Sequence, residues 1–291
     1  MPNTSVMLDV QHSTEYHYVE PVLQGRNEAW LIPRETPSQK VFDAEVVIEP
    51  DAESRSQRVD YFGNPVLSFE INDRHQDLVV TARSRVEITP RDLPAADETP
   101  AWEEVRPLCE PVLGALQASV AIYLFSSHLV RRNSVFLPYI ERSFTPKRPV
   151  FDAALDLSQR IYRDFRYSPG STKVDTTPEE AFVNRRGVCQ DFAHFLIACL
   201  RTMGVPARYV SGYLRSRPDL VGSEASHAWV SFYCPDFGWI DLDPTNNVVP
   251  SNSHVVLSWG RDYQDVPPIR GVALGGGDHE VKVSVGVTEV V

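Results

Sequence analysis

The stretch Gly187-Val188-Cys189-Gln190-Asp191-Phe192-Ala193-His194 places a cysteine where a turn gives way to a helix. Apolar residues then recur at the spacing of one helix face, at Phe192, Phe195, Leu196, Cys199, Leu200 and Met203. Gly204 and Pro206 end the predicted helix. Cys189 is therefore expected in the first turn, where free backbone N–H groups and the positive end of the helix dipole favour a thiolate. The pattern predicts a candidate nucleophile.

A catalytic thiol needs an imidazole to take its proton and a third group to orient that imidazole. His227 lies in the alternating stretch Ser226-His227-Ala228-Trp229-Val230, which predicts a strand. Asp241 and Asp243 share one face of the next predicted strand, over residues 239–243. If the two strands pair through the turn at 235–238, either carboxylate can lie beside His227. The pattern alone leaves both open.

The part of the chain before the cysteine changes character twice. Apolar and polar residues alternate over residues 10–18, 42–48, 67–71 and 78–88, which predicts antiparallel strands. A proline-rich acidic stretch at 89–100 then leads into a segment of helical character that ends before residue 149. We therefore expect an all-β sandwich domain over 1–90, a linker and helical connector over 91–148, and a catalytic core over 149–291.

The core segment has helices first and strands afterwards. Thr177-Pro178-Glu179-Glu180 has the pattern of a capping box and begins a short helix that leads to Cys189. Strands are predicted after the cysteine helix, over residues 207–214, 226–234, 239–243 and 281–287. This order indicates an α+β fold in which the nucleophile helix packs on an antiparallel sheet.

Composition narrows the function classes. The chain has 291 residues, and 28 Lys and Arg against 39 Asp and Glu give a net charge of −11. An acidic chain without a basic run argues against nucleic acid or an anionic membrane as partner. Residues 1–5 lack the basic and apolar regions of a signal peptide, so we expect a cytoplasmic protein. The spacing of Cys109, Cys189, Cys199 and Cys234 fits neither a zinc site nor a disulfide framework, and no metal or cofactor is expected.

The same motifs resemble bacterial transglutaminase-like proteins, often described as predicted cysteine proteases. The resemblance rests on residues 187–194, Ala207–Tyr213, Ala225–Trp229, Asp243–Asn246 and Gly260–Val266, and on His12, Thr14, Tyr16 and Phe62-Gly63-Asn64 near the N-terminus. It covers nearly the whole chain.

The resemblance implies a papain-like triad with Cys189 as nucleophile, His227 as base and Asp243 as orienting carboxylate, and so selects Asp243 over Asp241. The backbone N–H of Cys189 would be one oxyanion donor, and Tyr167 is the candidate for the second. The chain has no acidic loop of the EF-hand type, so the calcium dependence of the animal enzymes is not implied.

The chemistry expected from such a triad is acyl transfer at a carboxamide or peptide bond through a thioester on Cys189. Water resolving the thioester gives a protease or amidase, and a primary amine gives a transglutaminase. Hydrolysis of a peptide or protein substrate is favoured, because the sequence shows no dedicated site for an amine. A non-catalytic protein-binding module on the same fold is the alternative, and the presence of Cys189, His227 and Asp243 together speaks against it.

Overall fold

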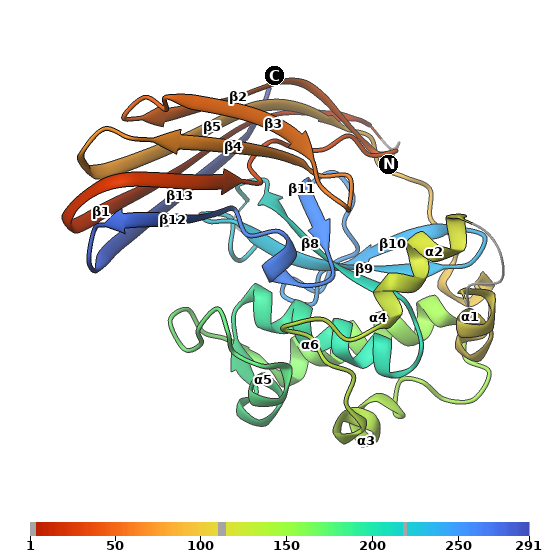
Figure 1. Ribbon diagram of the computed structural model, residues 1–291. Coiled ribbons are helices and arrows are strands. Elements are labelled where there is room, and N and C mark those ends of the chain that lie inside the picture. The colour runs from red at the N-terminus through yellow and green to blue at the C-terminus, as the bar shows by residue number, and fades with distance from the viewer. Residues whose placement is uncertain (1–3, 110–114, 218–219, 291) are drawn as a thin grey trace.

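The structure is a computed structural model that describes residues 4–109, 115–217 and 220–290. A curled antiparallel sheet lies above a smaller sheet, and helices pack beneath the smaller sheet (Figure 1). The larger sheet contains both ends of the described chain, and the smaller sheet and the helices come from its middle. None of the helices in the described ranges combines the length and the apolar character that a membrane crossing requires.

The curled sheet is organised around β1, Val6–Ala29, which has 24 residues. Its other strands from the first part of the chain are β2 (Gln39–Glu49), β3 (Ser54–Val59), β4 (Pro65–Ile71) and β5 (His75–Ile88), in the order β2-β5-β1-β4-β3. The beginning of β1 pairs with β5 and its end pairs with β4. The sheet therefore has two arms, β2-β5 and β4-β3, which share β1.

Apolar side chains of both arms meet in one core, formed by Ala29, Leu31, Ile48, Leu67, Phe69, Ile71, Leu78, Val80 and Ala82. The strands predicted over 10–18, 42–48, 67–71 and 78–88 are all present. The expected sandwich of two sheets is instead one continuous sheet that curls, because β1 is long enough to run through both arms.

A C-terminal hairpin completes the curled sheet. β12 (Ile269–Gly275) pairs with residues 22–29 of β1, and β13 (His279–Glu289) pairs with residues 8–18. The strand predicted over 281–287 is confirmed, but it lies in the N-terminal sheet and not beside the strands of the core. Alternation of apolar residues identifies a strand and carries no information on its partner, which explains the misplacement.

The smaller sheet has the antiparallel order β10-β9-β8-β11. Its strands are β8 (Ala207–Leu214), β9 (His227–Cys234), β10 (Gly238–Leu242) and β11 (His254–Gly260). Helix α6, Cys189–Thr202, packs on one face of this sheet, and Phe192, Phe195 and Leu196 share a core with Ala228 and Val230. The predicted α+β core, with its cysteine helix on an antiparallel sheet, is confirmed.

The other α-helices precede α6 in the chain. They are α1 (Trp102–Cys109), α2 (Ala115–Ala121) and α3 (Leu137–Ile140) in the connector, then α4 (Val150–Asp164) and α5 (Pro178–Asn184). Thr177 caps α5 by the predicted capping box with Glu180. After α5 the chain forms β7, Arg186–Gly187, which pairs in parallel with β6, Arg166–Tyr167, and so places Tyr167 beside the entry to Cys189.

Two buried amide side chains join the curled sheet to β11, the edge strand of the core sheet. The Gln39 amide donates to the carbonyl oxygen of Val256 at 2.7 Å and accepts from its N–H at 2.8 Å. The Asn64 amide does the same at Trp259, at 2.9 and 3.0 Å. Backbone groups on a sheet edge need partners when they are buried. The N-terminal part of the chain supplies those partners here.

We expect Asn64→Ala to lower the free energy of unfolding by roughly 2–4 kcal/mol, because it leaves both backbone groups of Trp259 without their buried partner. Denaturant titration of the purified variant measures this change. Asn72→Ala is the matched control, since Asn72 is exposed, and should cost less than about 0.5 kcal/mol. Equal losses in the two variants would contradict a role for Asn64 in holding β11.

Candidate active site

Cys189 is the first residue of α6 and is half-buried. Asp191, in the same turn, accepts hydrogen bonds from the Val188 N–H and the Thr172 hydroxyl, both at 2.7 Å. A Cβ at position 187 would lie 2.5 Å from the Asp191 carboxylate, so only glycine lets the carboxylate close over this turn. The motif around the cysteine therefore fixes the turn that presents the thiol at the helix start.

His227 is the first residue of β9, and its side chain is fully buried. Its Nε2–H donates to Asp243 Oδ2 at 2.8 Å, and its Nδ1 has no hydrogen-bond partner among the described residues. Burial alone would lower the pKa of His227, but Asp243 and the nearby Cys189 raise it to about 10. The raised pKa favours a protonated His227, and Nδ1 is the ring nitrogen left for proton exchange with Cys189.

Asp243 is surrounded by hydrogen-bond donors. Its Oδ2 accepts from His227, from His254 Nε2 at 3.1 Å and from the Asn246 side chain at 2.8 Å. Its Oδ1 accepts from the backbone N–H groups of Thr245 and Asn246, at 2.8 and 3.2 Å. Burial raises the pKa of this carboxyl, but the histidines and their hydrogen bonds outweigh burial and hold it well below its usual range. Asp243 is thus a buried, ionised carboxylate.

Asp241, the other carboxylate that the pattern left open, has a different partner. It accepts a hydrogen bond from the indole N–H of Trp229 at 3.1 Å. The Trp229 ring stacks on His227, with centroids 6.2 Å apart and planes 24° from parallel. Asp241 therefore holds the tryptophan that packs on the imidazole, and Asp243 holds the imidazole itself.

Tyr167 lies close to both Cys189 and His227. Burial, together with the charge of Cys189, raises the pKa of Tyr167 to about 12, so its hydroxyl is protonated at neutral pH and can donate. Gly222 lies between the two side chains: a Cβ there would be 3.2 Å from His227 Nδ1 and 3.6 Å from the Tyr167 hydroxyl. Its φ of +89° also favours glycine. A larger residue at 222 would fill the space beside the reactive nitrogen.

Two residues of this network were missed by the sequence reasoning. Asn246 bridges Asp243 and Val221, since its amide accepts from the Val221 N–H at 2.7 Å and donates to the carbonyl oxygen at 3.3 Å. His254, the first residue of β11, shares Asp243 with His227. Asn246 belongs to the Asp243–Asn246 motif, which was a usable signal. His254 has no motif around it, and only the fold shows its contact.

His227, Asp243 and His254 also lie close enough to be considered as metal ligands, since one donor atom of each lies within 4.8 Å of the others. Their nitrogen and oxygen atoms are already joined by hydrogen bonds, and the shared Asp243 oxygen also accepts from Asn246. The donor set fits a hydrogen-bonded network that orients His227.

Comparison with known proteins places the chain in a family. Residues 139–244 match the Transglutaminase-like superfamily, and residues 8–87 match the Bacterial transglutaminase-like N-terminal region. An uncharacterized protein of Mycobacterium tuberculosis (strain ATCC 25618 / H37Rv) is 37% identical over 291 residues, which cover 96% of this chain and 91% of that protein. One from Mycobacterium leprae (strain TN) is 34% identical over 296 residues, covering 97% and 98%.

The chain is also similar to an enzyme over a shorter stretch and to a solved structure over nearly its whole length. A protein-glutamine gamma-glutamyltransferase of Pseudomonas aeruginosa is 34% identical over 103 residues, which cover 32% of this chain and 15% of that protein. The crystal structure of a provisionally assigned cysteine protease from Cytophaga hutchinsonii has a TM-score of 0.79 at 21% identity, covering 99% of this chain and 91% of that one. Its likeness shows the same fold along nearly the whole chain. The chain therefore belongs to the transglutaminase-like superfamily and has the bacterial N-terminal region of that family.

Proposed function

We propose that this protein is a cysteine peptidase or amidase that cleaves a carboxamide or peptide bond of a peptide or protein through a thioester on Cys189. The observation that carries the proposal is the buried His227, which is hydrogen-bonded to an ionised Asp243 and has its other ring nitrogen free beside the cysteine. Membership in the superfamily supports cysteine-based catalysis in general.

The first half of the reaction forms the thioester. His227 takes the proton of Cys189, and the sulfur attacks the carbonyl carbon. Backbone N–H groups in the first turn of α6 and the Tyr167 hydroxyl are the proposed donors to the oxyanion, each worth about 2.7–4 kcal/mol in comparable sites. His227 then gives its proton to the leaving amine, the C–N bond breaks, and the acyl group stays on Cys189.

The second half decides the reaction class. Water, deprotonated by His227, attacks the thioester and releases a carboxylic acid and the free thiol. A primary amine attacking in the same way would leave a new amide. We propose hydrolysis, because an amine acceptor in water needs a binding site of its own and the sequence shows no motif for one. The similarity to the Pseudomonas aeruginosa enzyme over 103 residues is the observation that favours transamidation as the second candidate.

The experiment that tests the proposal follows both outcomes at once. Casein and a mixed peptide library are incubated with the purified protein, with and without the fluorescent amine dansylcadaverine, and products are read by mass spectrometry. We expect new carboxyl groups, from cleaved peptides or deamidated glutamines, with little incorporation of the amine. Amine incorporation exceeding hydrolysis would assign the transglutaminase reaction. Products that persist in Cys189→Ala would contradict catalysis by this thiol. The absence of any product, together with a Cys189 that iodoacetamide does not modify, would leave the binding module as the function.

A further inference from the structure

A cavity of about 400 Å³ lies behind the core sheet, where the sheet meets the first part of the chain. Strands β8, β10 and β11 form its floor, and residues 36–38, Arg91 and Leu93 contribute to its wall. Ala207 and Tyr209 of β8 belong to the core shared with α6, so Arg208 and Val210, which line the cavity, point to the opposite side of the sheet. Cys189, His227 and Asp243 do not line it. Its place between two parts of the fold is typical of small-molecule sites.

Arg208 is a buried, charged residue of the cavity lining. Its side chain is buried, with 8% of the residue exposed, and its guanidinium lies 3.6 Å from the ring centre of Trp259 and 4.2 Å from that of Trp239. Its Nε is buried without a hydrogen-bond partner. The Asp241 carboxylate is near enough to act on its charge, but no ion pair joins it to Arg208 among the described residues. A buried charge without a hydrogen-bonding counterion is costly.

Arg201 is a buried arginine whose guanidinium finds its hydrogen-bond partners within the chain. Its guanidinium donates to the carbonyl oxygen of Ala207 at 2.8 and 3.0 Å, to that of Arg261 at 2.6 Å and to the Ser127 hydroxyl at 3.2 Å. Arg208 lies in β8, the strand that follows α6, and no such hydrogen bonds join its guanidinium to the described residues. The stacked indoles satisfy the two faces of its guanidinium, and the N–H edge is left for an acceptor that comes from outside the chain.

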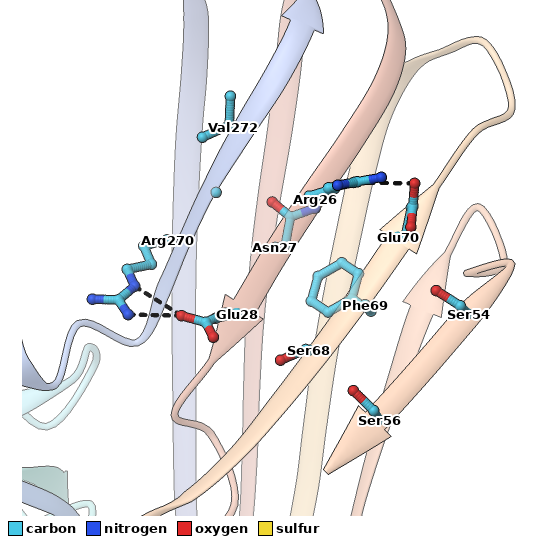
Figure 2. Close-up of a pocket in the computed structure, with 11 residues that line it drawn as sticks. Arg26, Asn27, Glu28, Ser54, Ser56, Ser68, Phe69, Glu70, Arg270 and Val272 are labelled. Atoms are coloured by element: carbon cyan, nitrogen blue, oxygen red, sulfur yellow. Dashed lines mark hydrogen bonds and ion pairs between the residues drawn. The ribbon is translucent and has the colours of Figure 1, made fainter. Parts of the chain in front are cut away.

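A hollow of about 580 Å³ on the curled sheet provides the contrast (Figure 2). Its charges are paired with one another: Arg270 binds Glu28 at 2.7 Å, and Arg26 binds Glu70 at 3.2 Å. These groups need no ligand to neutralise them. The cavity at Arg208 is smaller but holds a charge that the described chain leaves unpaired.

The charges of the lining residues favour a monoanion as the ligand. Arg91 and Arg208 are its cationic lining residues and Asp241 its acidic one, so the lining charge is 2 − 1 = +1. A carboxylate carries one negative charge and fits the N–H edge of a guanidinium with two parallel hydrogen bonds. A phosphate monoester carries about −1.5 to −2 at neutral pH and would be repelled by Asp241.

Much of the remaining lining is apolar, and this favours an apolar body for the ligand. Leu93, Val210 and Ile240 line the cavity together with the two tryptophans. We propose that this cavity is a binding site for a small monocarboxylate with a flat apolar body, whose carboxylate pairs with the edge of Arg208 and whose body lies against the indoles. The proposal does not depend on the reaction at Cys189.

Calorimetric titration of the full chain tests the proposal with three probes of one shape: phenylacetate, phenylacetamide and phenyl phosphate. We expect phenylacetate to bind with a Kd of about 1 mM or lower, and the other two about tenfold more weakly or worse. Cys189→Ala should bind phenylacetate as the wild type does, because the cavity is separate from the thiol. Equal binding of the neutral amide, tighter binding of the phosphate, or no heat at about 10 mM phenylacetate would overturn the proposal.

Two variants locate the binding. Arg208→Met keeps the stacked shape without the charge and should weaken phenylacetate about tenfold or more. Ser251→Trp, at an exposed position on the cavity lining, should block entry without disturbing the core, and it decides the matter if Arg208→Met fails to fold. Arg85→Met, on the outer part of the curled sheet, is the control and should bind unchanged. Binding that survives Ser251→Trp would place phenylacetate elsewhere and contradict the assignment.

Discussion

Replacing Cys189 by alanine is expected to lower kcat by about four to six orders of magnitude, because nucleophile and base act as one unit in a triad. The substitution removes a half-buried sulfur at the first position of α6, so the fold and the thermal midpoint should change little. Turnover of the substrate identified in the hydrolysis assay, measured at saturating concentration, gives the ratio directly.

Cys199→Ala is the matched control, since Cys199 lies on the same helix but is fully buried in the core. It should lose some stability, about 1 kcal/mol, and keep kcat. Iodoacetamide provides a second readout: Cys109, Cys199 and Cys234 are buried, so labelling of the native protein should be confined to Cys189. A fall in kcat that is as large in Cys199→Ala would mean that the helix, and not the thiol, was being tested.

Asp243→Asn is expected to lower kcat by about three to four orders of magnitude and to destabilise the fold by about 3–5 kcal/mol. The variant removes the charge that Asp243 supplies to the buried rings of His227 and His254. Without that charge, burial dominates and the pKa of His227 should fall from about 10. The pH dependence of kcat and urea titrations measure both effects.

His227 and Asp243 contribute to the pH dependence of stability with opposite signs. The pKa of folded His227 is raised from its ordinary 6.5 to about 10, so its contribution is complete below pH 6.5 and is lost as pH rises through about 10. The pKa of Asp243 is lowered from 3.8, so its contribution is complete above that pH and is lost as pH falls further. The stability gap between wild type and Asp243→Asn should therefore shrink between pH 6.5 and pH 10. A gap that is constant over this range would contradict the raised pKa.

Asp241→Asn is the matched control for the choice between the two carboxylates. Its amide oxygen can still accept from the Trp229 indole, so stacking on His227 is kept and kcat should stay within about threefold of wild type. If Asp241→Asn were the more damaging variant, the orienting role would belong to Asp241.

The sequence was sufficient for the local parts of the site. A 3.6-residue periodicity, a helix stop and a capping box depend on neighbours in the chain, so the start of α6 and the capping of α5 follow from short stretches. Pattern alone could not choose between Asp241 and Asp243, because β10 ends at Leu242 and Asp243 lies beyond the strand, bridged to Val248. The resemblance to known proteins was needed to choose.

Contacts between distant parts of the chain were beyond the sequence. His254 reaches Asp243 only because β11 lies in the core sheet, and β11 is held in turn by Gln39 and Asn64, far earlier in the chain. β3 was missed because all of its residues are exposed and show no apolar alternation. Such features depend on which strands pair, and a local pattern does not encode the partner.

The pairing of β1 with the C-terminal hairpin has a consequence for the order of synthesis. One side of this 24-residue strand has no partner until residues 269–289 have left the ribosome. β13 then packs Val287 against Tyr213 and Val255, and the Val285 N–H donates to the carbonyl oxygen of Glu224, in the segment that leads to His227. A nascent chain therefore carries its thiol for some time before the imidazole is fixed. The support of the segment before His227 is therefore completed only after residues 279–289 have been made, some 90 residues after Cys189.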